Sequence, residues 1–298
     1  MSWLQLILHC ERPAVAAAED ALLAAGAEAV TLADQADQPV FEPAVGETPL
    51  WDRVQVIGLF SADTDSAALL ATLSAALGTL PDHRLEILED QDWSRAWTSH
   101  YQPMRFGQRL WICPSWTPPP EPGAVNVLLD PGLAFGTGTH PTTALCLTWL
   151  DQQTLRGKTV IDYGCGSGIL AIAALLLGAE RALAVDNDPQ ALAATRDNAR
   201  RNGIADARLI TCLPGDVDAT WRADITVANI LAGPLIALAP RLAALTAANG
   251  RLALSGLLAS QAETVAGAYR PHFAMQSPTQ REEWVLLSGD RRGGPASD

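Results

Sequence analysis

The sequence has few cysteines, no long hydrophobic run and, in its first 90 residues, almost no basic side chains. Its five cysteines include no C-x-x-C pair and are odd in number, which argues against a disulfide framework or a cysteine-rich zinc site and fits a reducing compartment. The longest apolar stretch, residues 169–179, falls short of the roughly 18 residues that a membrane-spanning helix needs, and residues 1–10 lack the basic start of a signal peptide. We therefore expect free thiols, no metal site, no membrane contact and a cytoplasmic location.

The length and the charge distribution both suggest two domains. A chain of 298 residues can bury two separate cores, and 48% hydrophobic with 18% charged residues is typical of a globular protein. Residues 1–90 contain 15 acidic and three basic residues, a net charge of −12, whereas the whole chain carries −13. Such a segment can be a solubilising surface, which is the commoner case, or a docking surface for a basic partner. Because it would repel phosphates, we expect no direct nucleic-acid binding.

The first 90 residues alternate between strand and helix patterns. Strands are expected at 3–9, 28–32, 51–60 and 83–89, and helices at 13–26 and 64–78. This β-α-β-β-α-β order predicts a ferredoxin-like α+β domain over 1–90. Residues 91–104 follow as a linker helix in which Trp93 and Trp97, one turn apart, pack on a neighbour.

The remaining chain, residues 105–290, reads as an α/β domain, and 291–298 as a disordered tail. An apolar strand from residue 159 runs into Gly164-x-Gly166-x-Gly168 and then into an apolar helix over 169–178. Glycines allow close backbone approach to a ligand, and the helix start offers unpaired N–H groups. Asp186, which ends the next strand, lies about 20 residues on, the offset at which an acidic residue binds ribose hydroxyls. Together these features predict a nucleotide-type cofactor site.

A carboxylate decides which cofactor fits this turn. Dinucleotide-binding enzymes usually show G-x-G-x-x-G, whereas Asp162 stands two positions before the first glycine here. It would repel a pyrophosphate but could hold the amino group of a methionine moiety, which favours S-adenosylmethionine over NAD. The alternative is that Asp162 is a helix cap or turn carboxylate. For Asp186 the alternative is also a cap, although Asp188, directly before Pro189, suits that role better.

Two further segments should reach the same edge of the sheet. A strand over 223–231 ends in Asn229, whose amide oxygen could orient a substrate amine, unless it only closes a turn. The glycine-rich loop before residue 140 and the helix after it carry Phe135, which could cover the cofactor, and Thr143. His140, beside a proline, is expected to be a cap or packing residue. Strands at 251–256 and 282–289 and a helix at 260–270 complete the domain.

These segments together resemble the PrmA family. The blocks are DPGLAFGTGTHPTT (130–143), DYGCGSGILAIAA (162–174), VDNDPQA (185–191), VANILAGPL (227–235) and EEW (282–284). The resemblance implies a class I, Rossmann-like methyltransferase that modifies lysine and α-amino groups of the eleventh large-subunit ribosomal protein, with an N-terminal recognition domain and a mobile linker. It implies cofactor contacts at Thr143, Gly164, Asp186 and Asn229, and a lid from Phe135 through Gly136 and Thr137 to His140. To these cofactor contacts we add Asp162, Gly166, Phe135, Gly136 and Thr137.

The sequence after Asn229 bears on the substrate. Methyltransferases for planar amines typically have Asn/Asp-Pro-Pro-aromatic at this place, whereas this chain reads Asn-Ile-Leu-Ala (229–232). An sp³ amine has no face to stack on, so the absence of the aromatic fits lysine or an α-amino group. No general base is evident, and we expect a monomer. The alternatives are a nicotinamide-dependent oxidoreductase, which the glycine spacing disfavours, and a non-catalytic cofactor-binding module.

Overall fold

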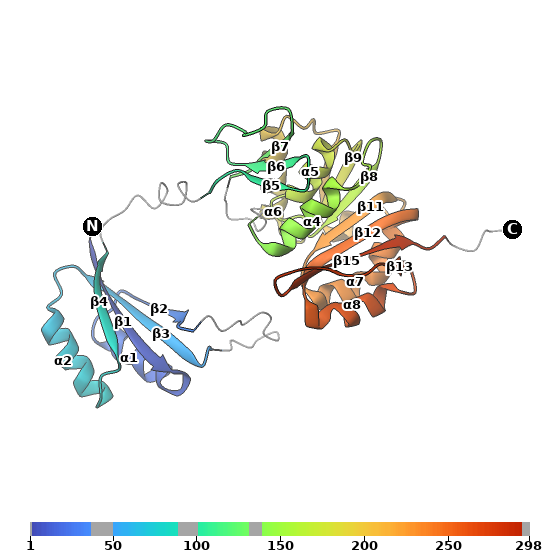
Figure 1. The fold of residues 1–298 in the computed structure, drawn as a ribbon. Coiled ribbons are helices and arrows are strands. Elements are labelled where there is room, and N and C mark those ends of the chain that lie inside the picture. The colour runs from blue at the N-terminus through green and yellow to red at the C-terminus, as the bar shows by residue number, and fades with distance from the viewer. Residues whose placement is uncertain (1, 37–49, 89–100, 131–138, 294–298) are drawn as a thin grey trace. The chain divides into compact units, whose positions relative to one another are not determined.

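The computed structural model describes residues 2–36, 50–88, 101–130 and 139–293 (Figure 1). The chain separates into two compact units, residues 1–99 and 100–298. None of the helices in these described ranges has the length and hydrophobicity of a membrane span. Each unit has its own hydrophobic core and is described by itself.

The N-terminal unit is a four-stranded antiparallel sheet with two helices. Its strands lie in the order β2-β3-β1-β4. The elements are β1 (Trp3–Glu11), α1 (Val15–Ala24), β2 (Ala29–Asp34), β3 (Arg53–Ser61), α2 (Ser66–Leu77) and β4 (His83–Leu88). Element order and strand order are those of the ferredoxin-like arrangement, as the sequence predicts.

Period-two alternation builds this sheet. Leu4, Leu6 and Leu8 are buried on one face, in the same cluster as residues from both α1 and α2. Both helices therefore cover one face of the sheet. The helix α2 begins where the Asp65 carboxylate accepts hydrogen bonds from two backbone N–H groups, and it ends at Gly78, which has a φ of 74°.

The C-terminal unit contains a larger, mostly parallel sheet in the order β10-β9-β8-β11-β12-β15-β13, with β14 paired to β15. The strands are β8 (Thr159–Tyr163), β9 (Arg181–Val185), β10 (Leu209–Cys212), β11 (Ala223–Asn229), β12 (Thr246–Leu258), β13 (Phe273–Met275), β14 (Thr279–Arg281) and β15 (Trp284–Arg291). Strands β8 to β12 are parallel, and β15 is antiparallel to β12.

Helices cover both faces of this sheet. One core contains buried residues of α4 (Pro141–Asp151), α5 (Ile169–Leu176) and α6 (Pro189–Arg201), and the other contains residues of α7 (Ala232–Leu245) and α8 (Ala262–Tyr269). The strand order runs outward in opposite directions from β8 and β11, so the carboxyl ends of these two strands form a switch point. Ligands bind at such points in Rossmann-like folds.

A small sheet packs beside the first core. It consists of β5 (Met104–Phe106), β6 (Leu110–Cys113) and β7 (Val125–Leu128), and its buried side chains belong to the same cluster as α4 and α5. The predicted linker helix over 91–104 lies mostly outside the described residues, including Trp93 and Trp97. Its last four residues are not helical: residues 101–103 are irregular and β5 begins at Met104. Pro103 explains this, because a proline disfavours helical geometry in the residue before it.

Two other expectations need correction. The sequence pattern predicts no helix between residues 231 and 250. The structure nevertheless has α7 at 232–245, with Pro240 in its interior. Burial of Leu235, Ala239 and Leu242 against the sheet outweighs the hydrogen bond that the proline removes. The tail predicted over 291–298 is wrong at its first residue, because β15 continues to Arg291 and pairs there with Phe273. Residues 294–298 lie outside the described ranges.

Candidate functional site

The glycine turn after β8 has a backbone that only glycine adopts easily. Gly164, Gly166 and Gly168 have φ values of 82°, 53° and 79°. A Cβ added at Gly164 would lie 2.2 Å from Cγ2 of Ile230, and one at Gly168 would lie 2.7 Å from Cγ2 of Thr195. The turn therefore combines a left-handed backbone with close packing. It directly follows β8, so its N–H groups lie at the carboxyl edge of the sheet.

Asp186 connects this turn to the end of β9. Its Oδ2 accepts a hydrogen bond from the Gly166 N–H at 2.9 Å, and its Oδ1 accepts one from the Asp188 N–H at 3.0 Å. The side chain is partly exposed, and each carboxylate oxygen retains a further lone pair for a ligand. Asp188 caps α6 through the Gln190 N–H at 2.8 Å, as the sequence predicts. Asp186 is thus not the cap of that helix.

Asn229 and Thr143 meet between β11 and α4. The Asn229 Nδ2 donates to the Thr143 Oγ1 at 3.2 Å, and the Thr143 side chain is completely buried. This bond fixes the orientation of the amide, so Oδ1 is the side-chain atom that remains for a ligand. Oδ1 is buried and has no hydrogen-bond partner among the described residues. A buried acceptor without a partner is costly, and a ligand N–H would remove that cost.

Asp162 lies beneath the turn. It is fully buried, its Oδ2 accepts a hydrogen bond from the Ala171 N–H at 3.0 Å, and its Oδ1 has no partner among the described residues. Burial raises the pKa of Asp162 to about 7, against the opposing effect of the Ala171 bond, and the nearby Asp186 adds to the rise. The bond to α5 is the one that a turn carboxylate makes, which is the alternative interpretation from the sequence. The other oxygen is buried, and Asp162 lines neither of the two cavities described below.

His140 begins α4. Its Nδ1 lies 2.8 Å from Thr142 Oγ1 and accepts from the Thr142 N–H at 3.3 Å, and its ring packs edge-on against Trp284 with centroids 4.8 Å apart. Burial lowers the pKa of His140, an effect that the carboxylates of Glu283 and Glu282 partly oppose. This residue is therefore a helix cap and a packing residue, as expected. Phe135, Gly136 and Thr137 lie outside the described residues.

Two adjoining cavities lie at this edge of the sheet. The smaller one, about 220 Å³, is bounded by Thr143, Gly164, Gly166, Asp186 and Asn229 together with Cys165, Ile169, Leu170, Asn187 and Ile230. Five residues predicted from different parts of the sequence are thus brought together.

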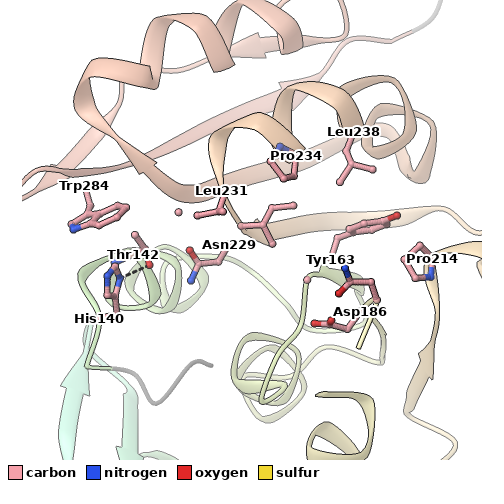
Figure 2. A pocket seen from close by; sticks show the side chains of 14 residues that line it. His140, Thr142, Tyr163, Asp186, Pro214, Asn229, Leu231, Pro234, Leu238 and Trp284 are labelled. Atoms are coloured by element: carbon pink, nitrogen blue, oxygen red, sulfur yellow. Dashed lines mark hydrogen bonds between the residues drawn. The ribbon is translucent and has the colours of Figure 1, made fainter. Parts of the chain in front are cut away.

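The larger cavity, about 630 Å³, extends from Asp186 past Asn229 to His140 and Trp284 (Figure 2). Much of its wall is apolar and includes Leu231 and Pro234. The sequence does not predict that Trp284 lines this cavity. Its only signal is its place in the EEW block (282–284).

The arrangement can hold an elongated ligand that is polar at one end and apolar at the other. Asp186 offers acceptors for hydroxyl groups, the glycine turn allows close backbone approach, and Asn229 Oδ1 offers an acceptor where the smaller cavity meets the larger one. The apolar wall beyond Asn229 suits an aliphatic chain. The site thus has room for two molecules that meet at Asn229.

Known proteins resemble the chain over almost its full length. The family model described as ribosomal protein L11 methyltransferase (PrmA) matches residues 2–292. The ribosomal protein L11 methyltransferase of Pseudomonas aeruginosa (strain LESB58) is 59% identical over 98% of this chain and 99% of that protein. The one from Marinobacter nauticus is 54% identical over 99% and 100%. A crystal structure of ribosomal protein L11 methylase from Lactobacillus delbrueckii subsp. bulgaricus superposes with a TM-score of 0.59 at 34% identity, covering 64% of this chain and all of that one.

The site fits the methyl donor that this likeness implies. Gly164 and Gly166 line the smaller cavity, Asp186 retains lone pairs for two ribose hydroxyls, and Oδ1 of Asn229 lacks a partner among the described residues. A positively charged donor suits such a set of acceptors. The chain belongs to the PrmA family of ribosomal protein L11 methyltransferases, enzymes that use S-adenosylmethionine.

Proposed function

We propose that this enzyme methylates lysine side chains and the N-terminal amino group of ribosomal protein L11. The observation that carries the proposal is the Asn229 amide, held by Thr143 with its Oδ1 unpartnered at the start of an apolar cavity. An amine N–H donated to that oxygen would point the nitrogen lone pair away from it, in an orientation set by the protein. The names of the curated relatives support the choice of L11 as the substrate.

The cofactor residues follow from the smaller cavity. Asp186 would accept hydrogen bonds from the ribose hydroxyls, Gly164 and Gly166 would contact the cofactor through their backbone, and Thr143 would act through Asn229. Asp162 would hold the methionine amino group, directly or through water, with its unpartnered Oδ1. When bound, S-adenosylmethionine supplies a methyl group on a positively charged sulfur, which an amine can attack in line.

The larger cavity favours a neutral amine. A free lysine has a pKa of about 10.4 and is charged at neutral pH. Apolar walls that include Leu231, Pro234 and Trp284 disfavour the ammonium form, which lowers the pKa of the entering amine without a dedicated base. Ala232 stands where the motif for planar amines has its aromatic residue, and the absence of that aromatic agrees with an sp³ substrate. Desolvation and orientation would then provide most of the rate.

The substrate-binding role falls to the N-terminal unit in this proposal. Residues 1–90 carry a net charge of −12, which would attract a basic ribosomal protein. Residues 105–290 would perform the transfer, and 91–104 would connect the two. We also propose that the enzyme acts as a monomer in the cytoplasm, where a ribosomal protein would meet it as a substrate.

Methylation of purified L11 tests the proposal. The enzyme and S-adenosylmethionine are incubated with L11, and the modified positions are mapped by mass spectrometry. We expect methyl groups on lysine side chains and on the N-terminal amine, and about a hundredfold slower methylation with the Asn229→Ala variant. Methyl groups confined to other residue types, such as glutamine or arginine, would contradict the assignment of the substrate amine.

A further inference from the structure

A third cavity, with a very different lining, lies at the opposite edge of the catalytic sheet. It has a volume of about 350 Å³ and is lined by Arg222, Arg291 and Arg292 together with small residues at the end of α7 and the start of β12. Arg222 directly precedes β11, whose far end is Asn229. Because a strand rises about 3.3 Å per residue, the two ends of β11 are roughly 20 Å apart. This arginine cavity is therefore separate from the methyl-transfer site.

Neutral carbonyl groups hold the three guanidinium groups in place. Arg222 donates to two carbonyl oxygens of its own turn, both at 2.7 Å. Arg291 donates to a carbonyl at the end of α7 at 3.0 Å and to one before β13 at 2.8 Å, and its guanidinium lies over the ring of Phe273. Arg292 donates to a carbonyl after α8 at 3.2 Å. These bonds fix the side chains without neutralising their charge.

The three arginines have no counter-ion among the described residues, whereas neighbouring arginines do. No described carboxylate lines the cavity, and none of the three forms an ion pair with a described residue. On the same part of the sheet, Arg251 pairs with Asp290 at 3.2 Å and Arg270 binds Glu263 at 2.6 Å. Asp290, next to Arg291 in sequence, is thus already engaged. Three positive charges converge on one cavity, and the described residues supply no negative charge there.

We propose that the arginine cavity binds a phosphate group. Each guanidinium retains a terminal nitrogen that makes no hydrogen bond to a described residue: Nη2 of Arg222, Nη2 of Arg291, and both terminal nitrogens of Arg292. Arginine forks match the oxygens of a phosphate, and a tetrahedral anion can accept from three directions at once. The phosphate can belong to an RNA strand or to a free ion such as pyrophosphate.

Charge reversal in the full-length enzyme tests this site. Binding of pyrophosphate is measured by isothermal titration for the wild type, for Arg222→Glu/Arg292→Glu, and for the control Arg196→Glu/Arg200→Glu on α6, which makes the same change in charge outside the cavity. Arg291 is kept because its bonds hold the end of α7. We expect the first pair to weaken binding by about tenfold or more through loss of charge-assisted hydrogen bonds, and the control pair by much less.

A fluorescently labelled single-stranded RNA distinguishes the two sources of phosphate. If RNA binds, is displaced by pyrophosphate and is lost in the Arg222→Glu/Arg292→Glu variant, the ligand is a phosphodiester. If pyrophosphate alone binds, the ligand is a free ion. Absence of binding of either probe by the wild type, or equal weakening by both double variants, would overturn the proposal.

Affinity for S-adenosylmethionine provides the folding check and should be the same in all three proteins. If the double variant loses it, Arg292→Gln alone is used, and pyrophosphate binding must still weaken for the proposal to stand.

Discussion

The two units of this chain use their sheets in different ways. In the N-terminal unit both helices cover one face of an antiparallel sheet. In the C-terminal unit helices cover both faces of a parallel sheet, so the side chains that could act on a ligand lie at an edge. We therefore assign the methyl transfer to this sheet edge of the C-terminal unit and, as proposed above, substrate docking to the acidic N-terminal unit.

Separating the two units should have the largest effect. Removal of residues 1–90 should abolish methylation of intact L11 and leave S-adenosylmethionine binding unchanged, because all described residues that line the two cavities come from the C-terminal unit. Methylation assays and cofactor titration on the truncated and full-length proteins check this. If the acidic surface only maintains solubility, the truncated enzyme will still methylate L11, and the docking proposal is then wrong.

Within the catalytic unit, Asn229→Ala should reduce turnover by about a hundredfold, the effect of a misplaced reactant. The dissociation constant of S-adenosylmethionine should change less, because only the Oδ1 contact is lost and Asp186 remains. Steady-state kinetics with a cofactor titration separate the two effects. An equal loss in both would make Asn229 chiefly a cofactor ligand, and unaltered kinetics would remove it from the site.

Asp186→Ala should weaken S-adenosylmethionine binding by roughly 1.5–3 kcal/mol, the value of hydrogen bonds to a charged acceptor. Part of this loss comes from the glycine turn, because the carboxylate also accepts from the Gly166 N–H. Asp188→Ala is a matched control from the same loop, since Asp188 caps α6 and lines neither cavity. Titration of both variants should show a defect only for Asp186. Equal affinities would place the ribose elsewhere.

Asp162 should make the stability of the cofactor-free enzyme depend on pH. Its pKa is raised to about 7 in the folded protein and is about 3.9 in an unfolded chain. Between these values the folded state holds a proton that the unfolded state releases, so the free energy of unfolding falls as the pH rises from about 4 to 7, by an amount on the order of 4 kcal/mol. Urea unfolding at several pH values should show this slope in the wild type and not in Asp162→Asn. If the free energy of unfolding varied with pH in the same way in both proteins, the pKa of Asp162 would not be raised by folding.

Much of the fold of both units, and part of the candidate site, can be predicted from the sequence. Alternation predicts the sheet of the N-terminal unit, and glycine spacing predicts the turn after β8, because both depend on residues that are close in the chain. Asp186 and Asn229 could be assigned to one site because parallel strands place their carboxyl ends at one edge. The bond between Asn229 and Thr143 could not be predicted, since it depends on how α4 packs against β11.

Features that depend on tertiary burial were missed. The helix α7 contains two prolines and a glycine within 14 residues, and intrinsic propensity opposes a helix there. Its formation depends on burial against the sheet. Trp284 carries no local signal for its contact with His140, because β15 and α4 are far apart in sequence. The buried position of Asp162 is likewise a property of the packed sheet and not of its neighbours in the chain.

The smallest expected effect is that of ionic strength, which should change the binding of L11 but not that of S-adenosylmethionine. The attraction between the acidic first 90 residues and a basic substrate acts over a distance that salt shortens, because the Debye length falls from about 10 Å at 0.1 M to about 3 Å at 1 M. The Michaelis constant for L11 should therefore rise with salt. The affinity for S-adenosylmethionine should change little, because its contacts are short and partly buried.

Steady-state kinetics in which only the salt concentration varies measure the first quantity, and titration under the same conditions measures the second. The truncated protein serves as the control, since any activity that it keeps should lack the salt dependence. A Michaelis constant that does not change across the salt range would mean that shape and apolar contact select the substrate. The net charge of −12 would then act on solubility alone.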